Sequence, residues 1–128
     1  MADLLDVELV AADRKVWSGE AAMVVARTLE GDIGILPGHA PLLGILFDGA
    51  VSIRQEGGDR VVAAVHGGFL SVSDDKVAIL AELAELADEI DEARAQRALD
   101  AARGSDDDAG VAAVQRAEAR LRARQLAG

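Results

Sequence analysis

The two histidines are the side chains best suited to acid–base chemistry in this chain of 128 residues, which contains no cysteine. His39 lies in the segment GDIGILPGHAPLLGIL, residues 31–46, where a general base would need a positioned carboxylate and a cavity. Asp32 and Asp48 are the acids nearby in sequence, and no serine or threonine occupies a recognisable nucleophile turn. His66 precedes two glycines and is expected to end a strand with a local hydrogen bond. We therefore expect no catalytic residue.

Metal and phosphate sites are equally poorly supported by the spacing of the reactive residues. The two histidines, far apart and without cysteine, make a poor zinc site, and the triplet Asp106 to Asp108 lacks the spacing of a calcium loop. The glycines of residues 31–38 are not followed by Lys-Ser or Lys-Thr and do not lead from a strand into a helix. We interpret 31–38 as a loop stiffened by proline, and we expect no metal site.

The composition argues against two classes of partner. A net charge of −10, from 13 basic and 23 acidic residues, would be repelled by phosphate backbones, so nucleic acid is not expected. Trp17, Phe47 and Phe69 are the only aromatic residues, which leaves little surface for base stacking. No apolar run approaches the roughly 18 residues of a membrane span. The opening MADLLDVELV carries acids where a secretory signal carries Lys or Arg, so neither membrane insertion nor a targeting segment is expected.

The first two thirds of the chain are typical of short strands. Runs rich in Val, Ile and Leu alternate with turn signals such as Pro37-Gly38, Asp48-Gly49 and Gly67-Gly68. The predicted strands cover residues 6–12, 21–29, 42–47, 50–55, 60–66, 69–73 and 76–80. Many short strands at such spacing predict an antiparallel sandwich or a flattened barrel.

The rest of the chain is typical of helices, rich in Ala, Glu, Asp and Arg. Two helices are predicted at 88–103 and 109–126, with Asp88 as the N-cap of the first. Ser105 or an acid of the following triplet is expected to cap the second. The short connection predicts an antiparallel αα-hairpin. The fold class is therefore α+β, mainly β, with a sandwich at 1–86 and a hairpin at 87–128.

Charge and apolar content predict how this hairpin packs. Six acids and no base occupy residues 82–92, whereas four arginines gather at 116–124, and we expect the two stretches to face each other. The expected contact face is mostly alanine with four larger residues, Leu99, Val111, Val114 and Leu121. Such a face buries little apolar area, so we expect a hairpin of low stability that can open or dock elsewhere.

Several stretches together resemble a known family, the epsilon subunit of bacterial F-type ATP synthase. They are Gly31-Asp-Ile-Gly-Ile-Leu-Pro-Gly-His-Ala-Pro-Leu-Leu43, the turn His66-Gly-Gly-Phe-Leu70, the opening Leu5-x-Val-Glu-Leu-Val10, Trp17-Ser-Gly19 and the charged hairpin. The resemblance implies a non-catalytic subunit whose ten-stranded β-sandwich lies at the foot of the rotating central stalk. It further implies contacts with the gamma subunit and the c-ring, and a peripheral location at the cytoplasmic face of the bacterial cell membrane.

The same resemblance implies roles for particular residues. The ring-contacting acid and histidine of the family match Asp32 and His39, with Asp in place of the Glu of some relatives. In the family the hairpin either folds against the sandwich or extends along gamma into the catalytic alpha/beta head, where it restrains ATP hydrolysis. Four arginines would then suit an acidic surface of beta: Arg116, Arg120, Arg122 and Arg124.

A regulatory nucleotide site is a further implication. Some relatives bind ATP through an Ile-Asp-x-x-Arg-Ala motif, which matches Ile90, Asp91 and Arg94 here, and later arginines of that site correspond to Arg116 and Arg120. One further arginine of the family site falls on Ala101 in this chain. In the structural alternative, Asp91 serves the helix N-terminus and pairs with Arg94. No cofactor is required, and ATP is the only small ligand expected.

Two other functions stay open at this point. The first is a free-standing β-sandwich that binds a small ligand, with the hairpin as a nucleotide sensor. The second is an enzyme whose active site contains His39, which requires a carboxylate within hydrogen-bond reach in a pocket. Neither accounts for the hairpin and the apolar segment 31–46 together.

Overall fold

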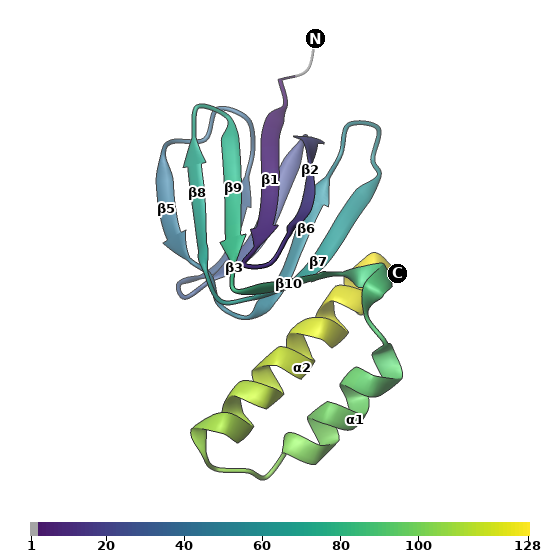
Figure 1. Cartoon of the computed structure of the whole chain (residues 1–128). Helices are drawn as coiled ribbons and strands as arrows, with labels where there is room; N and C mark the ends of the chain where they lie inside the picture. Colours follow the sequence, from purple (N-terminus) through teal and green to yellow (C-terminus); the bar gives the residue numbers. More distant parts are fainter. Residues whose placement is uncertain (1–2) are drawn as a thin grey trace.

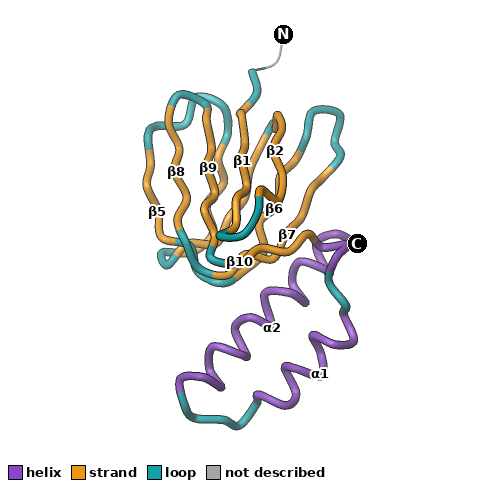
Figure 2. Tube along the Cα trace, in the orientation of Figure 1, coloured by secondary structure: helices purple, strands orange, loops and turns teal. Residues whose placement is uncertain are grey.

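The computed structural model describes residues 3–128 as two stacked β-sheets followed by two helices (Figures 1 and 2). The first two residues of the predicted sandwich unit lie outside the described residues. The strands are β1 (Leu5–Ala11), β2 (Lys15–Ala21), β3 (Met23–Thr28), β4 (Gly31–Ile35), β5 (Leu42–Ile45), β6 (Gly49–Arg54), β7 (Arg60–His66), β8 (Phe69–Ser73), β9 (Lys76–Ala81) and β10 (Leu83–Leu86).

The strands pair in two five-stranded sheets with a simple order. One sheet has the order β2-β1-β9-β8-β5 and the other β10-β7-β6-β3-β4. The predicted sandwich, in the class α+β with a helical hairpin, is confirmed. One pair departs from the antiparallel pattern, because β1 runs parallel to β9 with Leu9 opposite Ile79.

Strand β4 corrects the interpretation of residues 31–38 as a loop. Residues 31–35 pair with β3 as an edge strand, and only the remainder forms a connection. An edge strand needs a single apolar face, which Ile33 and the fully buried Ile35 supply. Of the four glycines in segment 31–46, only Gly31 and Gly38 have positive φ. Strand β10, and all of β2 except its last residue, Ala21, also lie outside the runs predicted from the hydrophobic pattern.

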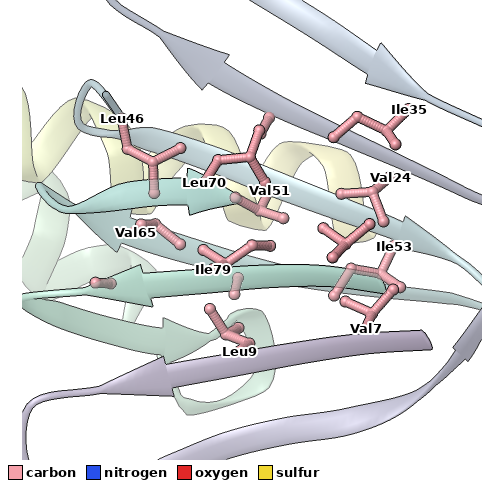
Figure 3. Close-up of a cluster of buried hydrophobic side chains, with 14 of the residues drawn as sticks. Val7, Leu9, Val24, Ile35, Leu46, Val51, Ile53, Val65, Leu70 and Ile79 are labelled. Atoms are coloured by element: carbon pink, nitrogen blue, oxygen red, sulfur yellow. The ribbon is translucent and has the colours of Figure 1, made fainter. Parts of the chain in front are cut away.

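The core lies between the two sheets and is built from alternate residues of each strand. Figure 3 shows side chains from both sheets meeting there, among them Leu9, Ile53 and Ile79. Strand β1 alternates strictly, with its odd-numbered residues buried and its even-numbered residues more exposed. Strand β7 is buried on both faces, which explains its unbroken apolar run.

The helices begin close to where the sequence predicts, with one different cap. A short 3-10 turn at Ala87–Glu89 precedes α1 (Glu92–Ala102), and α2 covers Asp108–Ala127. Asp91, and not Asp88, is the N-cap of α1: its Oδ1 accepts the backbone N–H of Arg94 at 3.0 Å. Asp107 caps α2 in the same way through Gly110, as the triplet prediction allowed.

Helix α2 packs on the outer face of β6 and β7, and α1 packs on α2 (Figure 1). The contact with the sheet is small and apolar, formed mainly by Val62, Ala64, Ala87, Ile90 and Ala123. Within the hairpin, Leu99 is buried as predicted. The prediction that Val111 lies in the contact face is wrong, because 47% of its surface is exposed. Gly110 takes the inward position of that turn, and the next residue points about 100° away.

Candidate functional site

Asp32 and His39 lie on the same open edge of the sandwich but are not in contact. Strands β4 and β5 are terminal strands of the two sheets, and the connection between them carries His39. Asp32 is exposed near the start of β4, opposite Arg27 of β3. His39 is half-buried, and its Nδ1 lies 2.7 Å from the carbonyl oxygen of Ala40. The two predicted contact residues therefore mark separate places along one edge.

The connection that carries His39 is held in place by the neighbouring sheet. The backbone N–H of Gly38 donates to Oδ1 of Asp75 at 2.7 Å, and the backbone N–H of His39 donates to the carbonyl of Leu36. Asp75 lies in the turn between β8 and β9 with a positive φ of 60°. This side-chain anchor, together with two prolines in the segment, gives the edge a defined shape.

An exposed apolar patch, defined here as Leu43, Ile45, Phe69 and Leu80, covers part of the outer face of the first sheet. Ile45 lies directly opposite Phe69, and Phe69 lies directly opposite Leu80, so three strands contribute to one surface. Leu43 is 76% exposed, and the other three are 44 to 59% exposed. Apolar side chains gathered in this way mark an interaction surface. The apolar character of residues 31–46 is visible in the sequence, but only the strand pairing brings Phe69 and Leu80 beside Ile45.

One polar cluster joins the sandwich to the hairpin. Nε of Arg120 lies 2.7 Å from Oε1 of Glu85, and the same oxygen lies 3.1 Å from Nε2 of His66. His66 does end a strand, as predicted, but its hydrogen bond is to β10 and is not local. The predicted facing of acidic and basic stretches is thus realised by the Glu85–Arg120 ion pair across the interface.

The four arginines of α2 do not share one face. Arg116, Arg120 and Arg124 follow one another at four-residue spacing, which keeps them within about 80° around the helix. Arg124 donates to the carbonyl oxygen of Ala87 at 3.3 Å, and its Nε is buried without a hydrogen-bond partner. Arg122 points to the other side, into a groove. With α2 packed on the sheet, Arg120 and Arg124 therefore face the sandwich, and the row Arg116, Arg120 and Arg124 is only partly exposed.

An open groove of about 870 Å³ runs between the second sheet and the hairpin. Five arginines and two acids are among its lining residues: Arg27, Arg54, Arg60, Arg103, Arg122, Asp32 and Glu118. Several of these cations already have partners. Arg27 stacks over Phe47, and Arg60 donates to the carbonyl of Leu126. The groove is therefore a polar seam between the two units.

The residues of the predicted nucleotide site are not arranged around this groove. Ile90 is buried in the contact with the sheet, and Asp91 is engaged as the helix cap. Arg94 is exposed on α1, and Arg120 is paired with Glu85. Neither these four nor Arg116 lines the groove or the smaller cavity beside Trp17. Binding of ATP stays a prediction.

The described part of the chain contains neither a metal-type cluster nor a helix fit to span a membrane. Within residues 3–128, no three or more His, Asp or Glu side chains lie close enough together to hold a metal ion. Neither α1 nor α2 combines the length and apolar character needed to cross a membrane.

Comparisons with known proteins agree with the β-sandwich and identify relatives that cover nearly the whole chain. The sequence model described as "ATP synthase, Delta/Epsilon chain, beta-sandwich domain" matches residues 4–87. An ATP synthase epsilon chain of Streptomyces griseus is 63% identical over 123 residues, covering 96% of this chain and 97% of the relative. The epsilon chain of Corynebacterium diphtheriae is 53% identical over 124 residues, with 96% and 94% covered.

Solved structures of ATP synthases contain chains with a similar fold. A chain in the mitochondrial ATP synthase of Euglena gracilis, an OSCP/F1/c-ring assembly, superposes with a TM-score of 0.82 at 29% identity, covering 92% of this chain and 79% of that one. A chain in the central stalk and c-ring of Tetrahymena thermophila ATP synthase shares the fold, with a TM-score of 0.60 at 19% identity and coverage of 96% and 95%. This chain belongs to the ATP synthase epsilon chain family.

Proposed function

We propose that this protein is a non-catalytic rotor subunit of a proton-translocating F-type ATP synthase, coupling rotation of gamma to the c-ring and restraining ATP hydrolysis through its hairpin. The observation that carries the proposal is the exposed apolar patch on a sandwich of the epsilon family. The 29% identical relative from Euglena gracilis belongs to an F1/c-ring assembly, which supports partners of that kind.

Gamma is the partner proposed for the apolar patch. The patch lies on paired strands of one sheet, so its side chains lose little conformational freedom when a partner covers them. A flat, rigid surface suits a subunit that must transmit torque. The c-ring is proposed to contact the neighbouring open edge, where Asp32 and His39 are placed along β4 and its connection to β5.

The hairpin is proposed as the brake on hydrolysis. Its contact with the sheet is small and rich in alanine, and few polar contacts add to it. Release of α2 would uncover Arg116, Arg120 and Arg124, which are partly buried in the docked form, whereas Arg122 is already exposed. We propose that Arg116, Arg120 and Arg124, which lie on one side of α2, then contact an acidic surface of the catalytic beta subunit, while the sandwich stays on gamma and the c-ring. Arg122 lies on the other side of the helix and would contribute charge at the margin of that contact.

The proposed location follows from the same assembly. The subunit would be peripheral, held at the cytoplasmic face of the bacterial cell membrane by contacts with other subunits and not by lipid. Nucleic acid is not among its proposed partners, because the chain has a net charge of −10. Catalysis would belong to other subunits of the complex.

The experiment is a comparison of enzyme reconstituted with the full chain and with the chain ended at Ala87. Faster ATP hydrolysis by the truncated enzyme, with proton pumping still coupled, would support braking by the hairpin and coupling by the sandwich. Loss of coupled pumping in the truncated enzyme would contradict the division of roles. Unchanged hydrolysis with intact coupling would contradict the brake and leave the rotor role in place.

A further inference from the structure

His66 is the only buried polar side chain within residues 3–128, with 4% of its surface exposed. The alternation of β7 explains this burial. Val61 and Val65 point into the sandwich core, whereas Val62, Ala64 and His66 point to the outer face that α2 covers. The ring is therefore shielded from water on the side where the hairpin docks, and release of α2 would expose it.

The hydrogen bonds of the ring leave one nitrogen unused. Nε2 lies 3.1 Å from Oε1 of Glu85, a carboxylate that can only accept, so we assign the proton of the neutral ring to Nε2. Nδ1 then carries a lone pair. It has no hydrogen-bond partner, and Oδ2 of Asp48 lies 4.0 Å from it. The other oxygen of Asp48 accepts the backbone N–H of Gly67 at 2.9 Å, which holds this carboxylate in place.

Charged groups from three elements act on the ring. Glu85 comes from β10, Asp48 from the connection between β5 and β6, and Arg120 from α2. Glu82 lies beside Gly67 at the end of the same strand pair. Burial is the largest influence and lowers the pKa of His66; the cation of Arg120 lowers it further, while the two carboxylates raise it. The net result is a pKa below the ordinary value for histidine.

We propose that His66 makes docking of the hairpin sensitive to protons, so that uptake of a proton at Nδ1 favours release of α2 from the sheet. In the docked posture a protonated His66 and Arg120 would be two cations that share one oxygen of Glu85. Release removes the cation of Arg120 and lets water reach the ring, whereas Asp48 and Glu85 remain on the sandwich. Both changes stabilise the protonated ring in the released form.

The direction of the pH effect follows by linkage. In the docked form, burial and the cation of Arg120 hold the pKa of His66 below its ordinary value. Release removes both influences, so by this proposal protons bind the released form more tightly. Docking is at full strength above the pKa of the released form and weakens as the pH falls toward the pKa of the docked form. One proton can change the docking equilibrium by up to about tenfold per pH unit in this interval. The consequence for hydrolysis rests on the proposed function: acid would engage the brake.

The test uses the isolated full chain, in which docking is measured apart from any ATPase activity. The chain has no cysteine, so Ser73→Cys and Ala101→Cys place one label on the exposed end of β8 and one on the exposed face of α1. The distance between the labels is followed between about pH 8 and pH 5, the range in which histidine titrates. The labelled chain is compared with His66→Gln, whose amide can still donate to Glu85, and with the control His39→Gln.

The expected result is a docked fraction that falls with acid in the parent chain and in His39→Gln but stays constant in His66→Gln. A docked fraction independent of pH in the parent chain would overturn the proposal, and so would an unchanged pH dependence in His66→Gln. Truncation at Ala87 can leave hydrolysis unchanged while the pH dependence of the label distance still requires His66. In that case the proposed brake is wrong and the proton-sensitive docking is supported.

A second variant keeps the proposal testable if His66→Gln does not fold. Arg120→Gln leaves His66 in place and removes the cation that competes for Glu85, so the docked pKa moves toward the released one. We expect a smaller docked fraction near pH 8 and a pH dependence shallower than that of the parent chain. A dependence as steep as in the parent chain would contradict the role given to Arg120.

Discussion

Nε of Arg120 lies 2.7 Å from Oε1 of Glu85, and this ion pair joins α2 of the hairpin to β10 of the sandwich. About a quarter of each side chain is exposed, so the pair is only partly screened by water. A charge-assisted hydrogen bond of this kind contributes about 1.5–3 kcal/mol. We expect Arg120→Gln to raise the released fraction of the hairpin at least about tenfold, measured as faster amide hydrogen exchange in α2.

The matched control is the exposed pair of Asp100 in α1 and Arg103 at its C-cap, at 3.7 Å with both side chains more than half exposed. An ion pair in such a position contributes about 0–1 kcal/mol, so Arg103→Gln is expected to leave exchange in α2 nearly unchanged. Equal exchange in the two variants would mean that the Glu85–Arg120 pair does not hold the hairpin.

Ala123 offers a way to release the hairpin without removing it. It is completely buried against Val62 and Ala64, so Ala123→Glu would place a carboxylate in an apolar contact with no partner. We expect the hairpin to leave the sheet while the sandwich stays folded. If the released hairpin is the brake, ATP hydrolysis by the reconstituted enzyme falls, the opposite of the effect of truncation at Ala87.

Ala93→Glu is the control for that variant, because position 93 is exposed in the first turn of α1, where an acid suits the helix end. Hydrolysis and hairpin exchange are expected to match the parent chain. Faster hydrolysis in Ala123→Glu would contradict the proposed brake, since the hairpin would then inhibit only when it is docked.

The sandwich and the hairpin could be predicted because their signals are local in sequence. Alternation in β1 and β6, turn glycines and Asp107 at the helix start each act over a few residues. Gly68 illustrates this point: it has a φ of +110°, and a Cβ there would collide with the carbonyl of Leu80. The turn was therefore visible as a Gly-Gly pair, although the contact that requires it was not.

The remaining features depend on tertiary contacts that no local pattern encodes. The β4 strand was missed because its glycines resemble a loop, whereas pairing with β3 decides its conformation. The apolar patch needs the register that sets Ile45 opposite Phe69. Glu85 and Arg120 were correctly placed on facing stretches, yet only the docked geometry brings His66 to the same oxygen.

The apolar patch predicts a binding defect without a folding defect. Leu43→Asp changes a side chain that is 76% exposed, so its effect on the free energy of unfolding is expected to stay within about 0.5 kcal/mol. A charge buried at the centre of an interface typically costs 2 kcal/mol or more, so affinity for the gamma subunit should fall roughly 30-fold. Titration calorimetry with isolated gamma measures this affinity, and thermal unfolding measures stability.

Val111→Asp provides the comparison for the patch, because Val111 is 47% exposed but lies at the start of α2, outside the patch. The affinity of the Val111→Asp variant for gamma is expected to match that of the parent chain. Equal losses in the two variants would show that an added acid, and not the position of the patch, weakens the complex.

Variants at Asp91 can distinguish a structural role of the Ile-Asp-x-x-Arg-Ala motif from a ligand-binding role. Its Oδ1 accepts the backbone N–H of Arg94 at 3.0 Å, and asparagine caps helices about as well as aspartate. Asp91→Asn should therefore keep the stability of α1, whereas Asp91→Ala should lose about 1 kcal/mol. Both are read from amide exchange in α1 with and without millimolar MgATP. If the motif binds ATP through the carboxylate, the nucleotide slows exchange in the parent chain and not in Asp91→Asn. If MgATP changes exchange in neither the parent chain nor Asp91→Asn, the motif acts as a helix cap alone and the predicted nucleotide site is wrong.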